Sequence, residues 1–152
     1  MNIDDKLEEL FIDLPELAAD VGHTLSAVQS GKLLYVAGAI PFSEGRVQFP
    51  GRVGVEVRAD NAKMAARMAA ICVLSAAKRE LGNFKSIRRV VHVYGFVACG
   101  ADFKDHAKVV DGASELFTQI FGPSGKHVRS LIGASSLPQN ACVEISVVFE
   151  IK

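Results

Sequence analysis

Residues 60–82, DNAKMAARMAAICVLSAAKRELG, constrain the fold of this chain more tightly than any other segment. The alanines recur at helical spacing along one side, and the lysines and arginines lie on the other side. Asp60 or Asn61 is a suitable N-cap, and Gly82 is a suitable C-terminal stop. We therefore expect one long helix whose small-residue face lies close against a sheet.

Segments rich in β-branched and aromatic residues on both sides of this helix are predicted strands. They are residues 21–30, 32–36, 87–97, 127–134 and 142–151. The dipeptide Ser30-Gly31 joins the first two segments as a tight hairpin. In the last segment the odd-numbered side chains are apolar and share one face, which is typical of a strand with one buried side.

Two further helices complete the pattern, a short one in residues 2–11 and a longer one in residues 103–121. The order of elements predicts an α+β domain with a mixed or antiparallel sheet and two helices on one face. No repeat or linker divides residues 1–152, so we expect one domain with a short helical extension over about residues 1–20. The other face of the sheet is too apolar to be fully solvated, and a subunit interface would cover it.

The composition excludes several classes of protein. Hydrophobic residues make up 49% of the chain and charged residues 22%, which excludes a disordered protein. Lys and Arg together count 17, as do Asp and Glu, so the basic excess typical of a nucleic-acid partner is absent. No apolar run has the roughly 20 residues that a membrane-spanning helix needs, so we expect no membrane partner.

The cysteines and the N-terminal residues predict a compartment. Cys72, Cys99 and Cys142 are odd in number, lack a CxxC motif and lie in apolar stretches. The first ten residues are acidic and amphipathic rather than a secretory signal. We therefore expect a cytoplasmic protein with reduced, mostly buried thiols.

The motifs predict neither a metal nor a cofactor. His23, His92, His106 and His127 lie in four separate segments, without HExxH or a Cys/His pair at ligand spacing. Glycine-rich phosphate loops and the GxSxG nucleophile motif are also absent. The histidines are therefore interpreted as structural or surface residues.

Arg129 and Glu144 are the candidate functional pair. Arg129 lies early in one predicted strand and Glu144 near the start of the next, and a turn at Pro138 would make them neighbours in an antiparallel pair. A guanidinium with no acid nearby in the sequence is suited to hold a carboxylate through two parallel hydrogen bonds. The alternative is that Arg129 and Glu144 pair with each other or face solvent.

The spacing of these residues resembles a known family. Arg129-Ser130, Leu137-Pro138 and Val143-Glu144-Ile145 match, without a gap, the closing motif of the RidA/YjgF family of reactive intermediate deaminases, also labelled endoribonuclease L-PSP. Residues 31–41, GKLLYVAGAIP, resemble the family's strand that ends in Ser-Gly-Gln-Ile-Pro. The helical N-terminus and the loop Phe49-Pro50-Gly51 resemble a longer branch of the family.

The resemblance implies a chorismate-mutase-like α+β fold, a homotrimer and ligand sites in clefts between subunits. In the family, the residue at Arg129 binds the substrate carboxylate, backbone groups at Leu131 and Gly38 help to hold the ligand, and the residue at Glu144 positions or activates water. The implied reaction is hydrolysis of a 2-enamino or 2-imino acid to a 2-oxo acid and ammonia. A protonated imine is already electrophilic, so orientation of the acid and one placed water supply what the reaction needs.

The chain departs from the family pattern at five positions. Leu131 replaces the usual Cys, Thr24 the usual Tyr, Ala37 the usual Ser, Ala39 the usual Gln and Asp111 a typical Asn. A carboxylate at Asp111 would oppose an anionic substrate or compete for Arg129. The predicted site therefore has Glu144 as its catalytic residue and, as its substrate-binding residues, Arg129, Leu131, Gly38, Thr24 and Asp111.

The sequence leaves three functions open. The first is the imine or enamine deaminase, and the second is a protein that binds a 2-oxo acid or another small carboxylate without turnover. The third is the ribonuclease of the family's older label, which the neutral net charge and the absence of a histidine pair disfavour.

Overall fold

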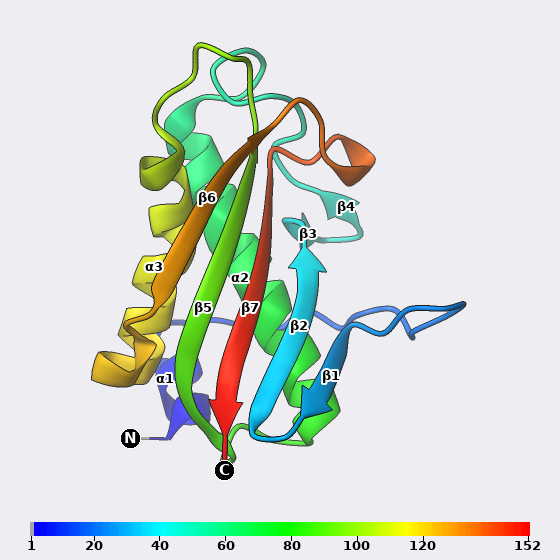
Figure 1. Ribbon diagram of the computed structural model, residues 1–152, viewed down its shortest axis with the longest axis vertical. Helices are drawn as coiled ribbons and strands as arrows, with labels where there is room; N and C mark the ends of the chain where they lie inside the picture. Colours follow the sequence, from blue (N-terminus) through cyan, green and yellow to red (C-terminus); the bar gives the residue numbers. More distant parts are fainter. Residues whose placement is uncertain (1) are drawn as a thin grey trace.

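In the computed structural model, which describes residues 2–152, a five-stranded sheet carries two long helices on one face (Figure 1). The helices are α1 (Ile3–Glu9), α2 (Ala59–Leu81) and α3 (His106–Phe121), with 3-10 turns at Gly122–Gly125 and Pro138–Asn140. The strands of the sheet are β1 (Ala27–Ser30), β2 (Leu33–Ala39), β5 (Ile87–Ala98), β6 (Val128–Ala134) and β7 (Val143–Ile151). A small hairpin joins β3 (Phe42–Ser43) to β4 (Arg46–Val47).

The sheet is mixed, as the sequence predicts. Its strand order is β1-β2-β7-β5-β6, and β5 and β6 are parallel whereas the other neighbours are antiparallel. Parallel neighbours need a crossover connection, and α3 supplies it between β5 and β6. The C-terminal strand β7 therefore lies in the middle of the sheet, between β5 and β2 (Figure 1).

The predicted hairpin at the start of the sheet is confirmed. Ser30 faces Leu33 across a two-residue turn, in which Gly31 has φ +60°, a value that favours glycine. Strand β2 continues to Ala39, beyond its predicted end at residue 36. Its register with β7 shifts between Val36 and Ala39, so the strand is irregular next to Gly38.

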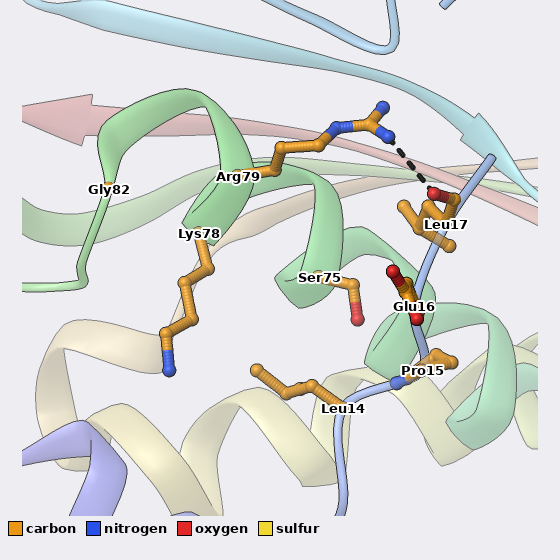
Figure 2. Close-up of a pocket in the computed structure, with 8 residues that line it drawn as sticks. All are labelled: Leu14, Pro15, Glu16, Leu17, Ser75, Lys78, Arg79 and Gly82. Carbon is orange, nitrogen blue, oxygen red and sulfur yellow. Dashed lines mark hydrogen bonds between the residues drawn. The ribbon is translucent and has the colours of Figure 1, made fainter. Parts of the chain in front are cut away.

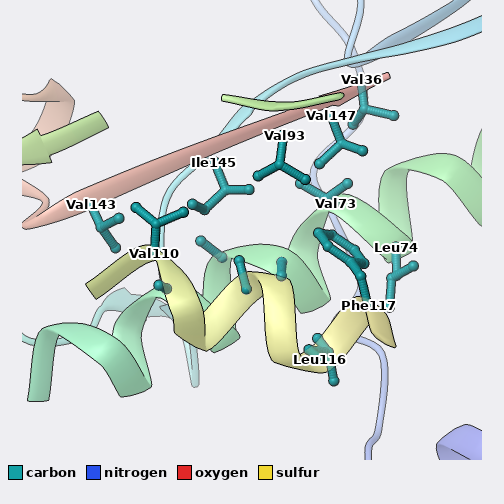
Figure 3. Packing of buried hydrophobic residues seen from close by; sticks show 14 of the residues in the cluster. Val36, Val73, Leu74, Val93, Val110, Leu116, Phe117, Val143, Ile145 and Val147 are labelled. Carbon is teal, nitrogen blue, oxygen red and sulfur yellow. The ribbon is translucent and has the colours of Figure 1, made fainter. Parts of the chain in front are cut away.

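The core lies between the sheet and the two long helices. In Figure 3, sheet residues such as Ile145 and Val147 point toward Val73 of α2 and Phe117 of α3. All four are fully buried, and so are the alanines along the sheet-facing side of α2. The small side chains let the backbone of α2 lie close to the strands, as its sequence predicts.

Helix α2 also lies close to α3, because Gly112 of α3 has no side chain at the point where the two helices meet. A Cβ atom at this position would overlap the backbone carbonyl of Lys63 on α2. Ion pairs cross the outer rim of the same contact, from Lys63 to Glu115 at 3.1 Å and from Lys108 to Asp60 at 3.1 Å. The two helices therefore form one layer that covers a single face of the sheet.

The other face of the sheet is open in this chain. The register places Val28, Tyr35, Val148, His92 and Val128 in one row across all five strands. Val28 and Tyr35 are each 46% exposed, and Val128 is 61% exposed. The row agrees with the prediction that this face is more apolar than a solvated surface needs to be.

Three details of the sequence prediction are wrong. The N-cap of α2 is Arg58 rather than Asp60 or Asn61, and Asp60 forms ion pairs with Lys108 and Arg58 instead. Helix α3 begins at residue 106 rather than 103. Strands β6 and β7 are not neighbours, because the crossover through α3 pairs β6 with β5.

The structure also bears on the predicted cysteines and on the predicted absence of a membrane-spanning helix. Cys72, Cys99 and Cys142 are all free and buried, as predicted, and burial raises the pKa of the Cys142 thiol to about 11. None of the helices within residues 2–152 combines the length and the apolarity that crossing a membrane requires.

Candidate functional site

Arg129 is held by α3, the helix that packs behind its strand. Its Nη1 donates to Asp111 Oδ1 at 2.8 Å and to Ser114 Oγ at 3.1 Å. The side chain is 24% exposed, and that of Asp111 is 43% exposed. Within residues 2–152 these two hydrogen bonds are the only ones that Arg129 donates, so Nε and Nη2 carry none. We call Arg129, Asp111, Ser114 and His127 the arginine half-site.

His127 completes this half-site through Ser114. The His127 ring nitrogen Nδ1 lies 2.6 Å from the carbonyl oxygen of Gly125, and Nε2 lies 2.9 Å from Ser114 Oγ. Because a carbonyl only accepts, Nδ1 carries the hydrogen of the neutral ring, and Nε2 accepts from the Ser114 hydroxyl. Burial lowers the pKa of His127, and the charge of Arg129 acts in the same direction, although the hydrogen bond to Gly125 opposes both. The neutral ring that this chain of hydrogen bonds requires is therefore favoured.

Glu144 lies in a different part of the sheet, beside Gly38. A Cβ atom at Gly38 would lie 2.5 Å from Glu144 Oε2, so the carboxylate occupies the space that a side chain there would take. Burial raises the pKa of Glu144, and no ion pair or hydrogen bond within residues 2–152 contributes to that shift. We call Glu144 and Gly38 the glutamate half-site.

The two half-sites are well separated within one chain. Arg129 is in register with Val93 of β5, whereas Glu144 is in register with Phe96, two strands from β6 and three residues further along. At standard strand geometry this is roughly 10 Å along the strands and roughly 10 Å across them. The expectation that Arg129 and Glu144 are neighbours in an antiparallel pair is therefore wrong, because β5 lies between them.

The half-sites also point to opposite faces of the sheet. Arg129 contacts α3, which covers the helical face. Glu144 lies between the fully buried Val143 and Ile145, so its side chain points to the open face. The alternative in which Arg129 and Glu144 pair with each other is therefore excluded within one chain, and the partner of Arg129 is Asp111.

Two other predicted site residues lie at opposite edges of the sheet. Leu131 is two residues beyond Arg129 on β6, on the same face, and is 36% exposed. Thr24 is exposed in the segment before β1, the strand at the other edge. The structure thus brings Asp111 to Arg129 and Gly38 to Glu144, and leaves Thr24 apart from both.

A pocket of about 310 Å³ on the helical side of β2 has Gly38 in its wall, but not Glu144. Ala37, Gly38 and Ala39 of β2 line one side, and Cys72 and Ala76 of α2 line another. Two of the predicted departures from the family pattern, Ala37 and Ala39, are therefore in the wall of a cavity. Their small side chains leave this space open.

A second pocket, of about 450 Å³, contains none of the predicted site residues (Figure 2). It lies between the end of α2 and residues 14–17. Arg79 holds the neighbouring backbone by donating to the carbonyl oxygens of Leu17 and Ala18, and it also forms an ion pair with Asp20 at 3.1 Å. The Arg79 guanidinium is thus used in contacts that hold the N-terminal segment against α2.

A cysteine and a histidine form a further contact just after β5. Cys99 Sγ lies 3.5 Å from His106 Nε2, next to Gly133, and Cys99 is only 7% exposed. Among the described residues, 2–152, no group of three or more His, Cys, Asp or Glu side chains is arranged to hold a metal ion.

Sequence reasoning missed Ser114 and His127. A signal for both is present in the sequence. Ser114 follows Asp111 by three residues on α3, so the two share a face of the helix. His127 precedes Arg129 by two residues and lies directly before β6. The contact between the elements is visible only once α3 is packed on β6.

Comparisons with known proteins identify the family. Residues 4–151 match the family described as "YjgF/chorismate_mutase-like, putative endoribonuclease". The chain belongs to the YjgF/RidA family. Protein TCP17 of Trypanosoma cruzi is 33% identical to it over 146 residues, which cover 95% of this chain and 91% of that protein. The mixed sheet with its helical layer is therefore the chorismate-mutase-like fold of this family.

Two solved structures share the YjgF/RidA fold over nearly the whole chain. The protein Atu1372 of unknown function from Agrobacterium tumefaciens has a TM-score of 0.92 and 37% identity, over 99% of this chain and 93% of that one. A "putative endoribonuclease" from Shewanella oneidensis MR-1 has a TM-score of 0.94 and 24% identity, over 99% of this chain and all of that one. The second likeness concerns the fold alone.

Proposed function

We propose that this protein hydrolyses reactive 2-enamino or 2-imino acids to 2-oxo acids and ammonia, in a cleft that two subunits share. The observation that carries the proposal is the state of the Arg129 guanidinium. It is anchored through Nη1 and three-quarters buried, while Nε and Nη2 have no partner within residues 2–152. A guanidinium edge with two free N–H groups side by side is suited to a carboxylate.

Glu144 is suited to the second role, that of positioning or activating water. Its carboxylate is partly desolvated, and burial raises its pKa, which makes it a better proton acceptor than an exposed glutamate. Water adds to the carbon of the protonated imine, and its proton passes to this carboxylate. Glu144 returns this proton to the carbinolamine nitrogen, and the C–N bond then breaks to release ammonia. The hydroxyl oxygen loses its proton as it becomes the carbonyl of the 2-oxo acid, and ammonia takes up that proton.

Two subunits are part of the proposal, and we infer a homotrimer. The half-sites of one chain point to opposite faces of the sheet, so a cleft that holds both needs Arg129 from one copy and Glu144 from another. The open face supports association, because the exposed row that contains Val28, Tyr35 and Val128 is apolar. We also propose a cytoplasmic location, since the three cysteines are free and buried.

The binding protein without turnover is the second candidate. Asp111 already forms an ion pair with one nitrogen of Arg129, and its negative charge opposes an anionic substrate. This favours a ligand other than the simplest imino acids. Leu131 and Thr24 in place of the usual Cys and Tyr also support this alternative. The balance of 17 basic and 17 acidic residues supports a ribonuclease least.

Imine turnover by Arg129→Ala tests the deaminase directly. Imino acids are generated in the cuvette by an amino acid oxidase, and their decay and the release of ammonia are followed. We expect wild-type protein to accelerate the decay and Arg129→Ala to lower kcat/KM about 30- to 1000-fold. Arg88→Ala removes an exposed arginine from β5 and serves as the matched control, with unchanged activity. Equal rates for wild type and Arg129→Ala across several imino acids would refute the deaminase.

The pH profile gives a second readout of the same site. Water activation needs the ionised form of Glu144, so activity falls as the pH drops through its pKa. Since burial raises this pKa, the acid limb is expected above the usual range of a glutamate. Tight binding of a 2-oxo acid without any turnover would select the binding protein.

A further inference from the structure

Two side chains connect the backbone before β6 to the guanidinium of Arg129. The His127 ring lies 2.6 Å from the carbonyl oxygen of Gly125 through Nδ1, and 2.9 Å from Ser114 Oγ through Nε2. Ser114 Oγ in turn lies 3.1 Å from Arg129 Nη1. We call His127 and Ser114 the bridge. Each of the two is bound on both sides, so the bridge is a continuous path of hydrogen bonds from the main chain to Arg129.

The main-chain end of the bridge is fixed by packing. Gly125 is buried at the end of the 3-10 turn, and a Cβ atom there would overlap the carbonyl oxygen of Phe117 on α3. The His127 ring meets the same residue edge-on, because the two rings are at 88° to each other with 6.3 Å between their centroids. Movement of either Gly125 or the His127 ring would therefore disturb the contact with α3.

The hydrogen bonds of the bridge have a defined direction, which the carbonyl of Gly125 sets. This carbonyl only accepts, so the neutral His127 ring has its hydrogen on Nδ1 and a lone pair on Nε2. The single hydrogen of the Ser114 hydroxyl then points to Nε2, and Ser114 Oγ accepts from Nη1 of Arg129. Without His127, that hydrogen would be free to donate to Asp111, which lies three residues earlier on α3. His127 therefore keeps both Ser114 and Asp111 as acceptors for Arg129.

Two acceptors on one nitrogen fix the orientation of a guanidinium. The group is planar, and both hydrogens of Nη1 lie in its plane. Asp111 Oδ1 and Ser114 Oγ accept one hydrogen each, so together they define the plane of Arg129 and the direction of its Nε and Nη2 edge. With Asp111 alone, the guanidinium could rotate about a single hydrogen bond. Within residues 2–152, the Nε and Nη2 edge has no hydrogen bond that would replace the missing one.

We propose that His127 positions Arg129, acting through Ser114, so that the guanidinium presents its Nε and Nη2 edge in one orientation. This inference rests on the proposed function, in which Arg129 holds the substrate carboxylate, and names the residues that prepare it for that role. An arginine that is already oriented loses less conformational freedom when a carboxylate binds. The carboxylate is held in the ground state and in the transition state alike, so the bridge contributes to KM rather than to kcat.

Two substitutions of His127 separate the bridge from a purely structural role. His127→Gln places an amide oxygen close to the position of Nε2, where it can accept from Ser114, whereas His127→Asn is shorter and reaches only the position of Nδ1. We expect His127→Asn to raise KM for imine turnover about 10-fold and to change kcat by less than about 3-fold. His127→Gln should restore most of the wild-type KM.

Ser114 gives a second, independent pair of variants. Ser114→Ala should match His127→Asn, and Ser114→Thr, which keeps the hydroxyl, should match wild type. Thr118→Ala removes an exposed hydroxyl one turn further along α3, and as the control it should leave KM unchanged. Urea unfolding confirms that each variant is folded before its kinetics are compared.

Pyruvate, a stable 2-oxo acid, reports the same interaction without turnover. Its dissociation constant is measured by NMR titration of the assembled protein. We expect His127→Asn and Ser114→Ala to weaken pyruvate binding about 10-fold, and His127→Gln to bind pyruvate like wild type. Equal weakening by His127→Asn and His127→Gln would overturn the bridge, because an acceptor near Nε2 would then make no difference.

Failure of this inference is distinguishable from failure of the proposed function. If His127→Asn keeps the wild-type KM and pyruvate affinity while Arg129→Ala loses both, the bridge is overturned and the deaminase stands. A lower kcat at unchanged KM in His127→Asn would also overturn the positioning role, since loss of folded protein has that effect. If the bridge controls pyruvate affinity in a protein that turns over no imine, the deaminase is overturned and the positioning role of His127 stands.

Discussion

Gly38 is the residue on which the position of Glu144 depends. A side chain at residue 38 would begin 2.5 Å from Oε2 of Glu144, closer than two such atoms can lie. Cδ and Cγ of Glu144 would also lie within 3 Å of the added atom, so the whole outer part of the side chain would have to rotate away, which a flexible glutamate can do at modest cost in stability. On the proposed function, Gly38 is therefore needed for the position of the Glu144 carboxylate rather than for the fold.

Gly38→Ala should therefore lose activity while it keeps its stability. Displacing the carboxylate by about 1 Å or more is expected to lower kcat about 100-fold. Imine turnover measures the activity, and urea unfolding measures the stability. Gly100→Ala is the control, because a Cβ atom there meets open space. Wild-type activity in Gly38→Ala would show that the carboxylate position is irrelevant to turnover.

The sequence predicted both members of the two contacts in the site and missed the hydrogen-bond network behind Arg129. Arg129 and Glu144 follow from motif spacing and Asp111 and Gly38 from the family resemblance, and the structure pairs Arg129 with Asp111 and Gly38 with Glu144. The hydrogen bonds through Ser114 depend on how α3 lies on β6. Spacing along the chain carries no information about that placement.

At the scale of elements, the helices and strands follow from local periodicity. Burial in the core confirms the apolar face of β7 and the alanine face of α2. Strand order is not local, and the sequence interpretation paired β6 with β7 because a turn separates them. The segment from β5 through α3 to β6 is a crossover between parallel strands, so β6 pairs with β5 although β7 follows it directly in the sequence.

Gly112 sets the distance between α2 and α3, and it gives a stability prediction. A methyl group at this position would overlap the Lys63 carbonyl, which belongs to a helix backbone and cannot move alone. Gly112→Ala is therefore expected to destabilise the protein by about 2–3 kcal/mol, despite the higher helix propensity of alanine. Urea unfolding measures the change, with Gly100→Ala as the near-neutral reference. A stabilised Gly112→Ala would mean that the helices can separate without loss of packing.

At the scale of the whole molecule, the proposed site is incomplete in one copy. The arginine half-site lies on the helical face at the β6 edge, and the glutamate half-site lies on the open face. A cyclic assembly with one interface type repeats the same pairing at every boundary. Each cleft would then take Arg129 from one subunit and Glu144 from its neighbour.

Mixing two inactive variants tests this arrangement. Arg129→Ala keeps the glutamate half-site, and Glu144→Gln keeps the arginine half-site, so a boundary between them restores one complete cleft. Random mixing of equal amounts forms such a cleft at about one quarter of boundaries, so about one quarter of wild-type activity is expected to return. The variants are refolded together, and native mass spectrometry confirms mixed assemblies before turnover is measured.

A double variant, Arg129→Ala with Glu144→Gln, supplies the control. Mixed with Arg129→Ala alone it contains no intact arginine half-site, so no activity should return. Mixed assemblies of the two single variants that stay inactive would exclude a cleft shared between copies. Because the half-sites of one chain face opposite ways, Glu144 would then have no way to reach a substrate held by Arg129, and the proposed division of roles between these two residues would be overturned.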